Sequence, residues 1–381
     1  MRNQQVCWQP SSEMGFLIQP TPLPSLADYL LPDIAQHLDS ISASLSIDIA
    51  DGIIRQTLDE LPVYDMTELI AEGQSLAIER ACQLYCYFAS AYVFMPHAEP
   101  ATKIPAGVAI PLVQLSDAVE RPPILSYAPY TLANWQKIDP DGDIVVDNLQ
   151  LLQKFITKRD AAWFTLIHVD IEKRAAPAIG AIPTLLTAVA QNDLDTVSMS
   201  LMVIHDALLA MMTTLKRMPE HCHPQVYYHE VRPYIFGFEN VIYEGVDKFG
   251  GKAQSFRGET GAQSSIIPAL VRALGLSHEE TSMTQHLRIM RDYMPRPHRD
   301  FIISIDDSAL RGYIVQQKNT PLRDVHNETL QQLLAFRKMH LRFAASYIAN
   351  QSADSLGTGG TDFMHWLQQL IDETQAHLIT S

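Results

Sequence analysis

Apolar residues recur at intervals of three and four along most of the chain, the spacing that places side chains on one face of a helix. The pattern is clear near residues 58–61, 78–85, 201–212 and 334–348. Alternation of apolar and polar residues, which is typical of strands, is rare, and no long internal repeat occurs. The sequence therefore predicts an all-α fold.

Turn-forming residues divide this helical pattern. Ser277 with Glu280 three residues later is a capping-box signal, so we expect a helix to begin there. The polar stretch 137–147 is typical of a surface connection between domains. We therefore expect a smaller helical domain over residues 1–150 and a larger helical domain over residues 151–381.

Composition limits the class of protein. Of 381 residues, 47% are hydrophobic and 19% are charged, the usual balance of a globular protein that can bury a cofactor. The 28 basic and 43 acidic residues give a formal net charge of −15, and no stretch is rich in Lys and Arg. Nucleic acid is therefore not an expected partner.

The sequence also favours a cytoplasmic protein without a membrane span. The first thirty residues lack the apolar segment of an export signal. The longest uncharged run, residues 175–192, contains Pro177 and Pro183, so we expect a pair of buried helices there. The four cysteines, Cys7, Cys82, Cys86 and Cys222, are too few and too scattered for a disulfide scaffold. Cys82 and Cys86 are four apart on an expected helix and could share a metal, but we expect ordinary core thiols there.

Metal ligands are not evident from the 14 histidines alone. The pair Glu220 and His223 lies between two prolines rather than inside a helix, which argues against a di-iron bundle. His298 and Asp300 have the spacing of a facial triad, but the sequence offers no third ligand beside them. For any single histidine, a structural role is the more common one.

Six short segments, in a fixed order over about residues 103–365, change this picture. They resemble segments of the indoleamine 2,3-dioxygenase family and read PPIL (122–125) with Tyr127 and LANW (132–135), YEG (243–245), QSS (263–265), RDYMPRPHR (291–299), the helix around His340, and GTGGTD (357–362). The resemblance implies an all-helical enzyme that binds haem b in its larger domain, while the smaller domain closes the pocket. It further implies a reaction in which both atoms of O2 add across the indole C2–C3 bond of L-tryptophan or a close derivative.

The resemblance implies that His340 is the iron ligand and that Arg337 pairs a haem propionate. The residues agree, because Leu333, Leu341 and Ala344 give His340 an apolar helix face on which a flat macrocycle can pack. Arg337 lies one turn before His340 on that face. Its alternative role is a solvent-exposed helix cation.

The same resemblance places His168 and Phe164 on the opposite, distal side of the haem. Together with Ile167 and Ile171 they are spaced to share one helix face. Animal members of the family carry serine where His168 stands, so this position is more similar to tryptophan 2,3-dioxygenase. A neutral imidazole there can accept a hydrogen bond from the indole N–H or steady bound oxygen. The alternative is a histidine bonded to a backbone carbonyl.

Further substrate contacts follow from the resemblance. Arg232 matches the arginine that clamps the substrate carboxylate, and Pro233 should keep it out of helical geometry, at a helix end. Tyr127 lies in a matching segment. Tyr227 stands where animal members have phenylalanine, and Tyr130 replaces a smaller residue. Buried tyrosines that serve only as core are the alternative.

Two glycine-bearing segments complete the implied site. Thr260 and Gly261 should approach the distal face of the haem, because residues without bulk let backbone come near a ligand. The family's segment there is richer in glycine than this one. Residues 357–361 resemble a mobile loop that closes over substrate, with Thr358 able to bond the substrate ammonium. A plain linker is the alternative reading of that loop.

Two other functions stay open at this point. One is an oxygenase that acts on another indole in secondary metabolism, which the tyrosines at 130 and 227 would suit, although Arg232 argues for a carboxylate-bearing substrate. The second is a protein that binds haem or a gas without catalysis. A helical scaffold protein that binds no haem is a third function, and the sequence favours it least.

Overall fold

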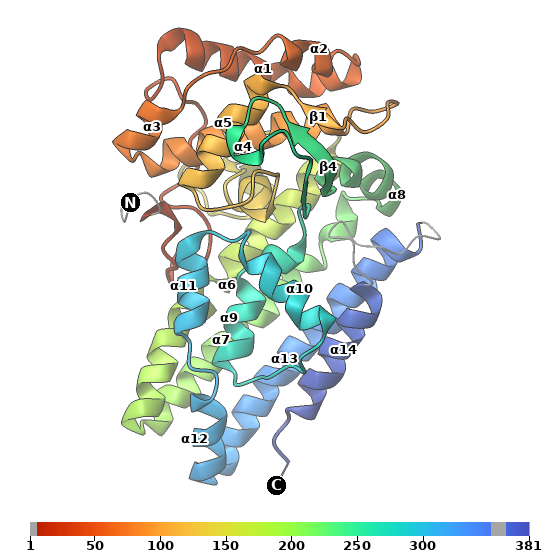
Figure 1. The fold of residues 1–381 in the computed structure, drawn as a ribbon. Coiled ribbons are helices and arrows are strands. Elements are labelled where there is room, and N and C mark those ends of the chain that lie inside the picture. The colour runs from red at the N-terminus through yellow and green to blue at the C-terminus, as the bar shows by residue number, and fades with distance from the viewer. Residues whose placement is uncertain (1–5, 352–362, 381) are drawn as a thin grey trace.

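Helices make up most of the computed structural model, which describes residues 6–351 and 363–380 (Figure 1). The α-helices of the first half are α1 (Pro32–Ala50), α2 (Ile54–Asp59), α3 (Thr67–Glu72), α4 (Ser75–Val93), α5 (Ala106–Ala118), α6 (Arg159–Gln191) and α7 (Leu194–Leu215). Those of the second half are α8 (Pro224–Val226), α9 (Ile266–Ala273), α10 (Ser282–Arg291), α11 (Arg296–Ser304), α12 (Ala309–Gln317), α13 (Thr320–Ala344) and α14 (Phe363–Ala376). The prediction of an all-α fold is confirmed.

Short strands form two small additions to this helical fold. One sheet has the order β1-β4-β5, with β1 parallel to β4 and β4 antiparallel to β5; its strands are β1 (Lys103–Ile104), β4 (Phe238–Tyr243) and β5 (Gln254–Phe256). The other is an antiparallel pair of β2 (Gln136–Lys137) and β3 (Leu149–Gln150). The predicted surface connection over residues 137–147 forms the loop of this pair, where the Asn148 side chain bonds the backbone of Asp139.

The long helices of the lower part in Figure 1 frame the candidate site. Helix α7 packs against both α6 and α13, and α13 packs against α14. Residues 175–192, expected as two helices, instead lie in the single helix α6 and its C-cap, with Pro177 and Pro183 inside it. Each proline removes a backbone hydrogen bond, and the packing of α6 along α7 offsets that loss.

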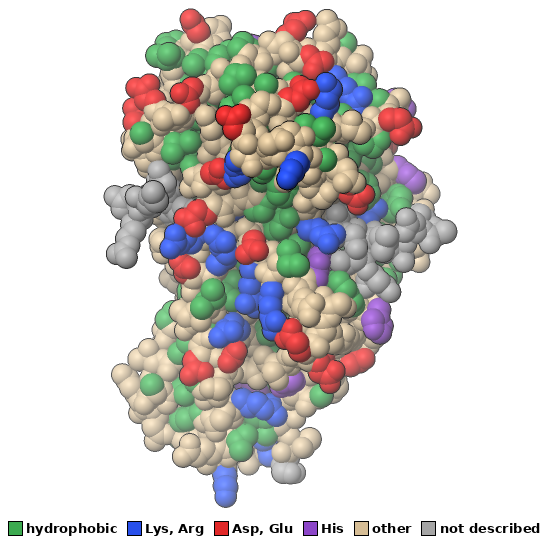
Figure 2. Space-filling view, in the orientation of Figure 1, with side chains coloured by type: hydrophobic (Ala, Val, Ile, Leu, Met, Phe, Trp, Pro, Cys, Tyr) green, Lys and Arg blue, Asp and Glu red, His purple; other side chains and the backbone are tan. Residues whose placement is uncertain are grey.

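One apolar segment, Leu194–Glu220, is long enough to cross a bilayer by length and composition. It contains α7, whose inner face is buried at Val197, Leu201 and Leu208. Because α7 lies against α6 and α13, its apolar face serves the core of the protein. Figure 2 shows acidic side chains spread over the visible face, in keeping with the net charge of −15.

The hydrophobic side chains form two clusters that do not divide at residue 150. One gathers α1–α5 with residues 234–246. The other is built on α6, α7 and α13, and it also takes in residues 7–18 and 127–149. A domain boundary at 150 stays a prediction.

The predicted cap of α10 lies four residues too early. Helix α10 begins at Ser282, and its capping box is formed by Thr281 and Thr284. Ser277 is engaged elsewhere, since its backbone N–H and its hydroxyl both contact His377 Nε2, at 3.1 Å in each case. A side chain held by His377, just after the end of α14, cannot also cap α10.

Candidate active site

Aromatic side chains from four segments meet beside α6. We call Tyr127, Phe164, His168, Tyr227 and Tyr347 the aromatic cluster. The Phe164 ring lies 4.7 Å from that of His168 and 4.4 Å from that of Tyr227. The Tyr127 ring meets His168 edge-on at 6.4 Å, and Tyr347 meets Tyr227 at 5.9 Å. The structure thus brings together four residues that the sequence suggested as distal contacts.

His168 has a fixed proton. Its Nδ1 lies 2.7 Å from the carbonyl oxygen of Phe164, one turn earlier on α6. A carbonyl oxygen only accepts, so Nδ1 carries the proton and Nε2 keeps a lone pair. Burial lowers the pKa of His168, which favours the neutral form. The backbone bond given above as an alternative role is therefore present, and it leaves Nε2 able to accept a hydrogen bond.

His340 has an exposed side chain, but the protein around it disfavours the charged form of its ring. Its side chain is exposed, yet the surrounding protein lowers its pKa to about 4. A side chain that is both accessible and desolvated lines a recess rather than an outer surface. His168 also contributes to this lowered pKa, so the two imidazoles lie near each other, one on α6 and one on α13. Among the described residues His340 has no side-chain partner, so its neutral imidazole can ligate a metal.

Arg337 turns from the recess toward α14. One of its terminal nitrogens donates to the carbonyl oxygen of Leu370 at 2.6 Å and to the hydroxyl of Thr374. It is 5% exposed, so the solvent-exposed alternative is wrong, and burial lowers its pKa to about 10. Its Nε is buried and has no hydrogen-bond partner among the described residues, and the pairing of Arg337 with a haem propionate stays a prediction.

Arg232 lies between two aromatic rings. Its guanidinium carbon is 5.0 Å from the Tyr228 ring centroid and 4.8 Å from that of Phe236. Stacking of this kind holds the planar fork in one orientation. The expected non-helical geometry at Arg232 is wrong, because its φ of −56° and ψ of −36° are helical. Pro233 stands in the first turn of a 3₁₀ helix (Arg232–Ile235), where no N–H is needed.

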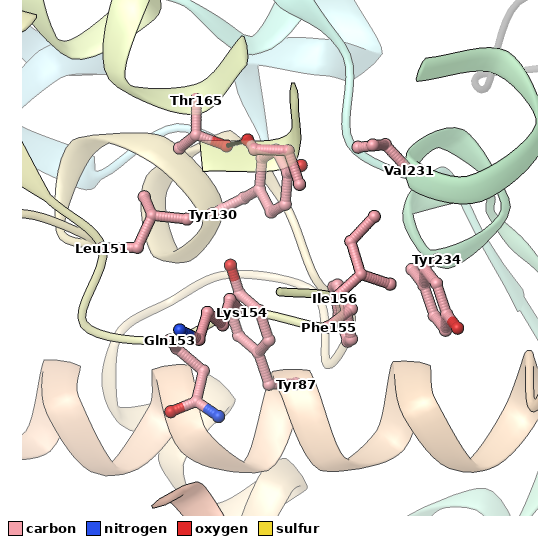
Figure 3. A pocket seen from close by; sticks show the side chains of 11 residues that line it. Tyr87, Tyr130, Leu151, Gln153, Lys154, Phe155, Ile156, Thr165, Val231 and Tyr234 are labelled. Carbon is pink, nitrogen blue, oxygen red and sulfur yellow. Dashed lines mark hydrogen bonds between the residues drawn. The ribbon is translucent and has the colours of Figure 1, made fainter. Parts of the chain in front are cut away.

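Tyr130 is turned toward α4 and Thr165. Its ring stacks on Tyr87 at 6.3 Å, and the Thr165 side chain lies beside it (Figure 3). Beside them is a cavity of about 10 Å³, roughly the space of one water molecule. It is lined by Tyr87, Tyr130, Leu151, Gln153, Lys154, Phe155, Ile156, Ala161, Thr165, Val231 and Tyr234. Figure 3 shows the Tyr87 hydroxyl pointing toward Tyr130.

Two buried carboxyl groups near the aromatic cluster were missed from the sequence. Burial raises the pKa of Glu259 to about 8, and Glu259 in turn raises the pKa of Tyr127, Tyr130 and Tyr227. Burial raises the pKa of Glu172 to about 7. The only sequence signal was Glu259 itself, a charged residue in a segment that is richer in glycine in the family.

The remaining predicted site residues are Thr260, Gly261 and Thr358. Thr260 caps a short 3₁₀ helix, Gly261–Gln263, by accepting from the N–H of Ala262 at 3.4 Å. A side chain on Gly261 would meet open space. Thr358 and residues 357–361 lie outside the described residues. The contacts of Thr260 and Gly261 with a cofactor stay predictions.

Other candidate metal groups are not supported. Among residues 6–351 and 363–380, no three His, Cys, Asp or Glu side chains gather around a metal-sized site. His298 is buried with its Nδ1 3.2 Å from the hydroxyl of Ser265, while Asp300 is exposed. Cys82 and Cys86 are free, buried thiols, as expected. Haem needs only one protein ligand on one face of its iron, and the assignment of His340 to that role stays a prediction.

A long-helix scaffold that presents one neutral imidazole to a recess is compatible with a protein that holds haem iron through one histidine. The sequence model described as "Indoleamine 2,3-dioxygenase" matches residues 7–377. The chain belongs to the indoleamine 2,3-dioxygenase family, and it is accordingly an oxidoreductase rather than a gas-binding module.

Named relatives cover nearly the whole chain. Rat indoleamine 2,3-dioxygenase 1 is 31% identical, over 97% of this chain and 94% of its own length. Indoleamine 2,3-dioxygenase nanC of Aspergillus nanangensis is 29% identical, over 94% and 93%. 6-Hydroxytryptophan 2,3-dioxygenase fscD of Fusarium equiseti is 27% identical, over 96% of each chain.

Proposed function

We propose that this protein binds haem b through His340 and adds O2 across the C2–C3 bond of L-tryptophan or a close indole derivative. The observation that carries this proposal is the pair His340 and His168. One imidazole is accessible, desolvated and without a side-chain partner among the described residues, and the second lies near it with a free Nε2. The first suits an iron ligand, and the second suits a partner for the indole N–H.

The protein's own side chains bind and orient the substrate in this proposal. His168 Nε2 accepts the hydrogen bond of the indole N–H, and the rings of Phe164 and Tyr227 form an apolar wall. Arg232, held flat by its flanking rings, clamps the carboxylate. The bound haem supplies the O2 chemistry, and the surrounding protein excludes water. Tyr127 acts as a further wall.

Four further residues and the location complete the proposal. Arg337 offers its Nε to a haem propionate, Thr260 and Gly261 approach the haem, and Thr358 bonds the substrate ammonium. The smaller domain closes the pocket. A cytoplasmic location accords with the four free thiols.

A hydroxylated indole is the second candidate substrate. Tyr130 and Thr165 place two hydroxyl groups beside the small cavity, and Glu259 adds a carboxyl group nearby. Such groups can bond a hydroxyl on the benzene ring of the substrate. The relative from Fusarium equiseti is named for 6-hydroxytryptophan. Product from 6-hydroxytryptophan but not from tryptophan would favour this candidate.

The test of the reaction is optical. The protein is reconstituted with haem and reduced, L-tryptophan is added in air, and absorbance of N-formylkynurenine is followed. Product formation establishes the activity. A normal haem spectrum without product from either substrate would reject the proposed reaction.

His340→Ala tests the ligand. We expect loss of stable haem binding, because alanine has no group that can ligate the iron. The readout is the Soret absorbance after gel filtration. His97→Asn is the matched control, since His97 is exposed and its φ of +59° suits asparagine. A normal Soret band in the His340 variant contradicts the assignment.

A further inference from the structure

Glu172 joins three segments of the candidate site. It lies one turn after His168 on α6 and is fully buried, with 0% exposure. Its Oε1 accepts two hydrogen bonds, from the hydroxyl of Tyr127 at 3.0 Å and from the hydroxyl of Ser264 at 2.8 Å. Tyr127 precedes a π-helical turn (Ala128–Leu132), and Ser264 ends the segment that contains Thr260.

A second set of hydrogen bonds also joins two of these segments. It involves no titratable group. The side-chain oxygen of Gln263 accepts from the backbone N–H of Tyr127 at 2.9 Å. Its amide nitrogen donates to the carbonyl oxygen of Gly258 at 2.8 Å. The backbone at Tyr127 is thus held at any pH, whereas its ring is held through Glu172.

We propose that Glu172 is a positioning residue for substrate binding, which as an ionised carboxylate holds the Tyr127 ring beside His168 and holds the segment at Ser264, and which loosens both on taking up a proton. The inference rests on the proposed function, because Tyr127 and His168 are there expected to contact the substrate.

The strength of these bonds depends on the charge of Glu172. A hydrogen bond to an ionised carboxylate is about twice as strong as one between neutral groups. Burial raises the pKa of Glu172 to about 7, while the bonds from Ser264 and Tyr127 lower it, so both forms occur near neutral pH. Its Oε2 is buried without a partner among the described residues, and it can therefore take the proton.

Several titratable groups lie around Glu172, and we assign the change near neutral pH to Glu172 itself. From its own helix, His168 is neutral, and Asp170 accepts instead from the Val146 N–H and from Arg174. Tyr127 and Ser264 face it from the other elements, and burial raises the pKa of Tyr127 so that it keeps its proton. From the N-terminal segment, Gly15 lies against the Glu172 carbonyl oxygen. Glu259 acts on Tyr127 but is not a cause of the shift at Glu172.

The first experiment needs no substrate. The infrared C=O band of a protonated, buried carboxyl group is followed in the full-length protein, with and without haem, as the pH is raised. We expect a component that titrates near neutral pH and is absent from Glu172→Gln. Its midpoint should rise in Ser264→Ala, because that variant removes a bond that favours the ionised form. Asp170→Asn, another buried carboxyl of α6, is the matched control and should keep this component.

The second experiment measures the effect on substrate. In the wild-type protein and in Asp170→Asn, we expect KM for L-tryptophan to fall about fivefold as the pH rises through the infrared midpoint. Glu172→Gln should have a high KM that does not change with pH over this range, with a kcat close to that of the wild type. A residue that only supports the fold would instead lower stability in the variant and leave the pH profile in place.

The outcomes separate this inference from the proposed function. If neither tryptophan nor 6-hydroxytryptophan is turned over, the proposed function fails. The presence of the infrared band in the wild-type protein, its loss in Glu172→Gln and its midpoint in Ser264→Ala still test the hydrogen bonds of Glu172. A band that does not titrate, or a midpoint that stays the same in Ser264→Ala, would contradict the proposed hydrogen bonds of an ionised Glu172 to Tyr127 and Ser264. A KM profile unchanged in Glu172→Gln overturns the positioning role while the reaction stands.

Discussion

At the scale of single residues, the site depends on where protons reside. The carbonyl of Phe164 fixes the proton of His168 on Nδ1, and burial keeps the ring neutral, so Nε2 faces its partner as an acceptor only. Serine at this position both donates and accepts. The histidine thereby favours a donor partner such as an indole N–H over a second acceptor.

Arg232→Lys should weaken amino-acid substrates while haem binding stays normal. Lysine keeps the charge but loses the planar fork that Tyr228 and Phe236 hold flat. We expect KM for L-tryptophan to rise about tenfold or more. Steady-state kinetics and the Soret band provide the two readouts.

A matched control is available on α6. Arg159 also stacks on an aromatic ring, 5.3 Å from the Trp163 centroid, but it is exposed. Arg159→Lys should leave KM unchanged. An equal rise of KM in both variants would mean that the loss at Arg232 is not a loss of carboxylate recognition.

The sequence could indicate some site residues and not others. His340 belongs to a segment whose order and spacing match a family, and Phe164 and Arg232 stand at positions that the same resemblance implies. Glu172 has no such signal, since a glutamate within a helix usually reads as a solvent-facing residue. Its partners lie 45 and 92 residues away in the chain, so only the packing of α6 reveals them.

At the scale of elements, the apolar periodicity predicted the helices well. The residues expected to start or stop a helix predicted the helix ends less well. The stripes around residues 201–212 and 334–348 became α7, α13 and its π-helical end, Ala345–Ala349. The breaks expected at Pro177 and Pro183 did not occur, and the expected cap at Ser277 was engaged by His377. Local signals therefore failed where a tertiary contact outweighed them.

Arg121→Met tests how the N-terminal segment is held on α4. Arg121 forms a buried ion pair with Glu79, which also accepts from Trp8 Nε1 at 2.7 Å. Removing the arginine leaves a buried carboxylate without its cation, which costs about 3 to 5 kcal/mol of unfolding free energy. Denaturant unfolding measures this loss.

An exposed pair provides the contrast. Arg288 and Glu280 are 2.5 Å apart, with side chains 60% and 56% exposed. Arg288→Met should change the unfolding free energy by less than about 1 kcal/mol. Similar losses in the two variants would show that burial of the Glu79 pair contributes little.

At the scale of the whole molecule, buried titratable groups set the pH range in which the fold is most stable. Burial lowers the pKa of His298 and of His326, the latter to about 4, so neither is charged in the folded protein. The unfolded chain binds protons at these histidines below about pH 6.5. Stability is therefore lost as the pH falls below that value.

Glu172 and Glu259 have the opposite effect. Their pKa values are raised to about 7 and about 8, so the folded state holds protons that the unfolded state has released above about pH 4.5. Stability therefore falls as the pH rises, by about 1.4 kcal/mol per pH unit for each group, until the folded pKa is reached. Above pH 6.5 the histidines no longer compensate, and the two carboxyl groups together should cost about 2 to 3 kcal/mol by pH 8.

Glu259→Gln should remove most of this alkaline loss, because Glu259 has the higher pKa and glutamine keeps the shape of the protonated acid. Denaturant unfolding at several pH values between about 6.5 and 8 measures the slope. Glu239→Gln, at an exposed position of β4, is the control and should retain the wild-type slope. A wild-type slope in Glu259→Gln would mean that this carboxyl group is already ionised in the folded protein at neutral pH, so that a negative charge rather than a neutral acid acts on Tyr127, Tyr130 and Tyr227.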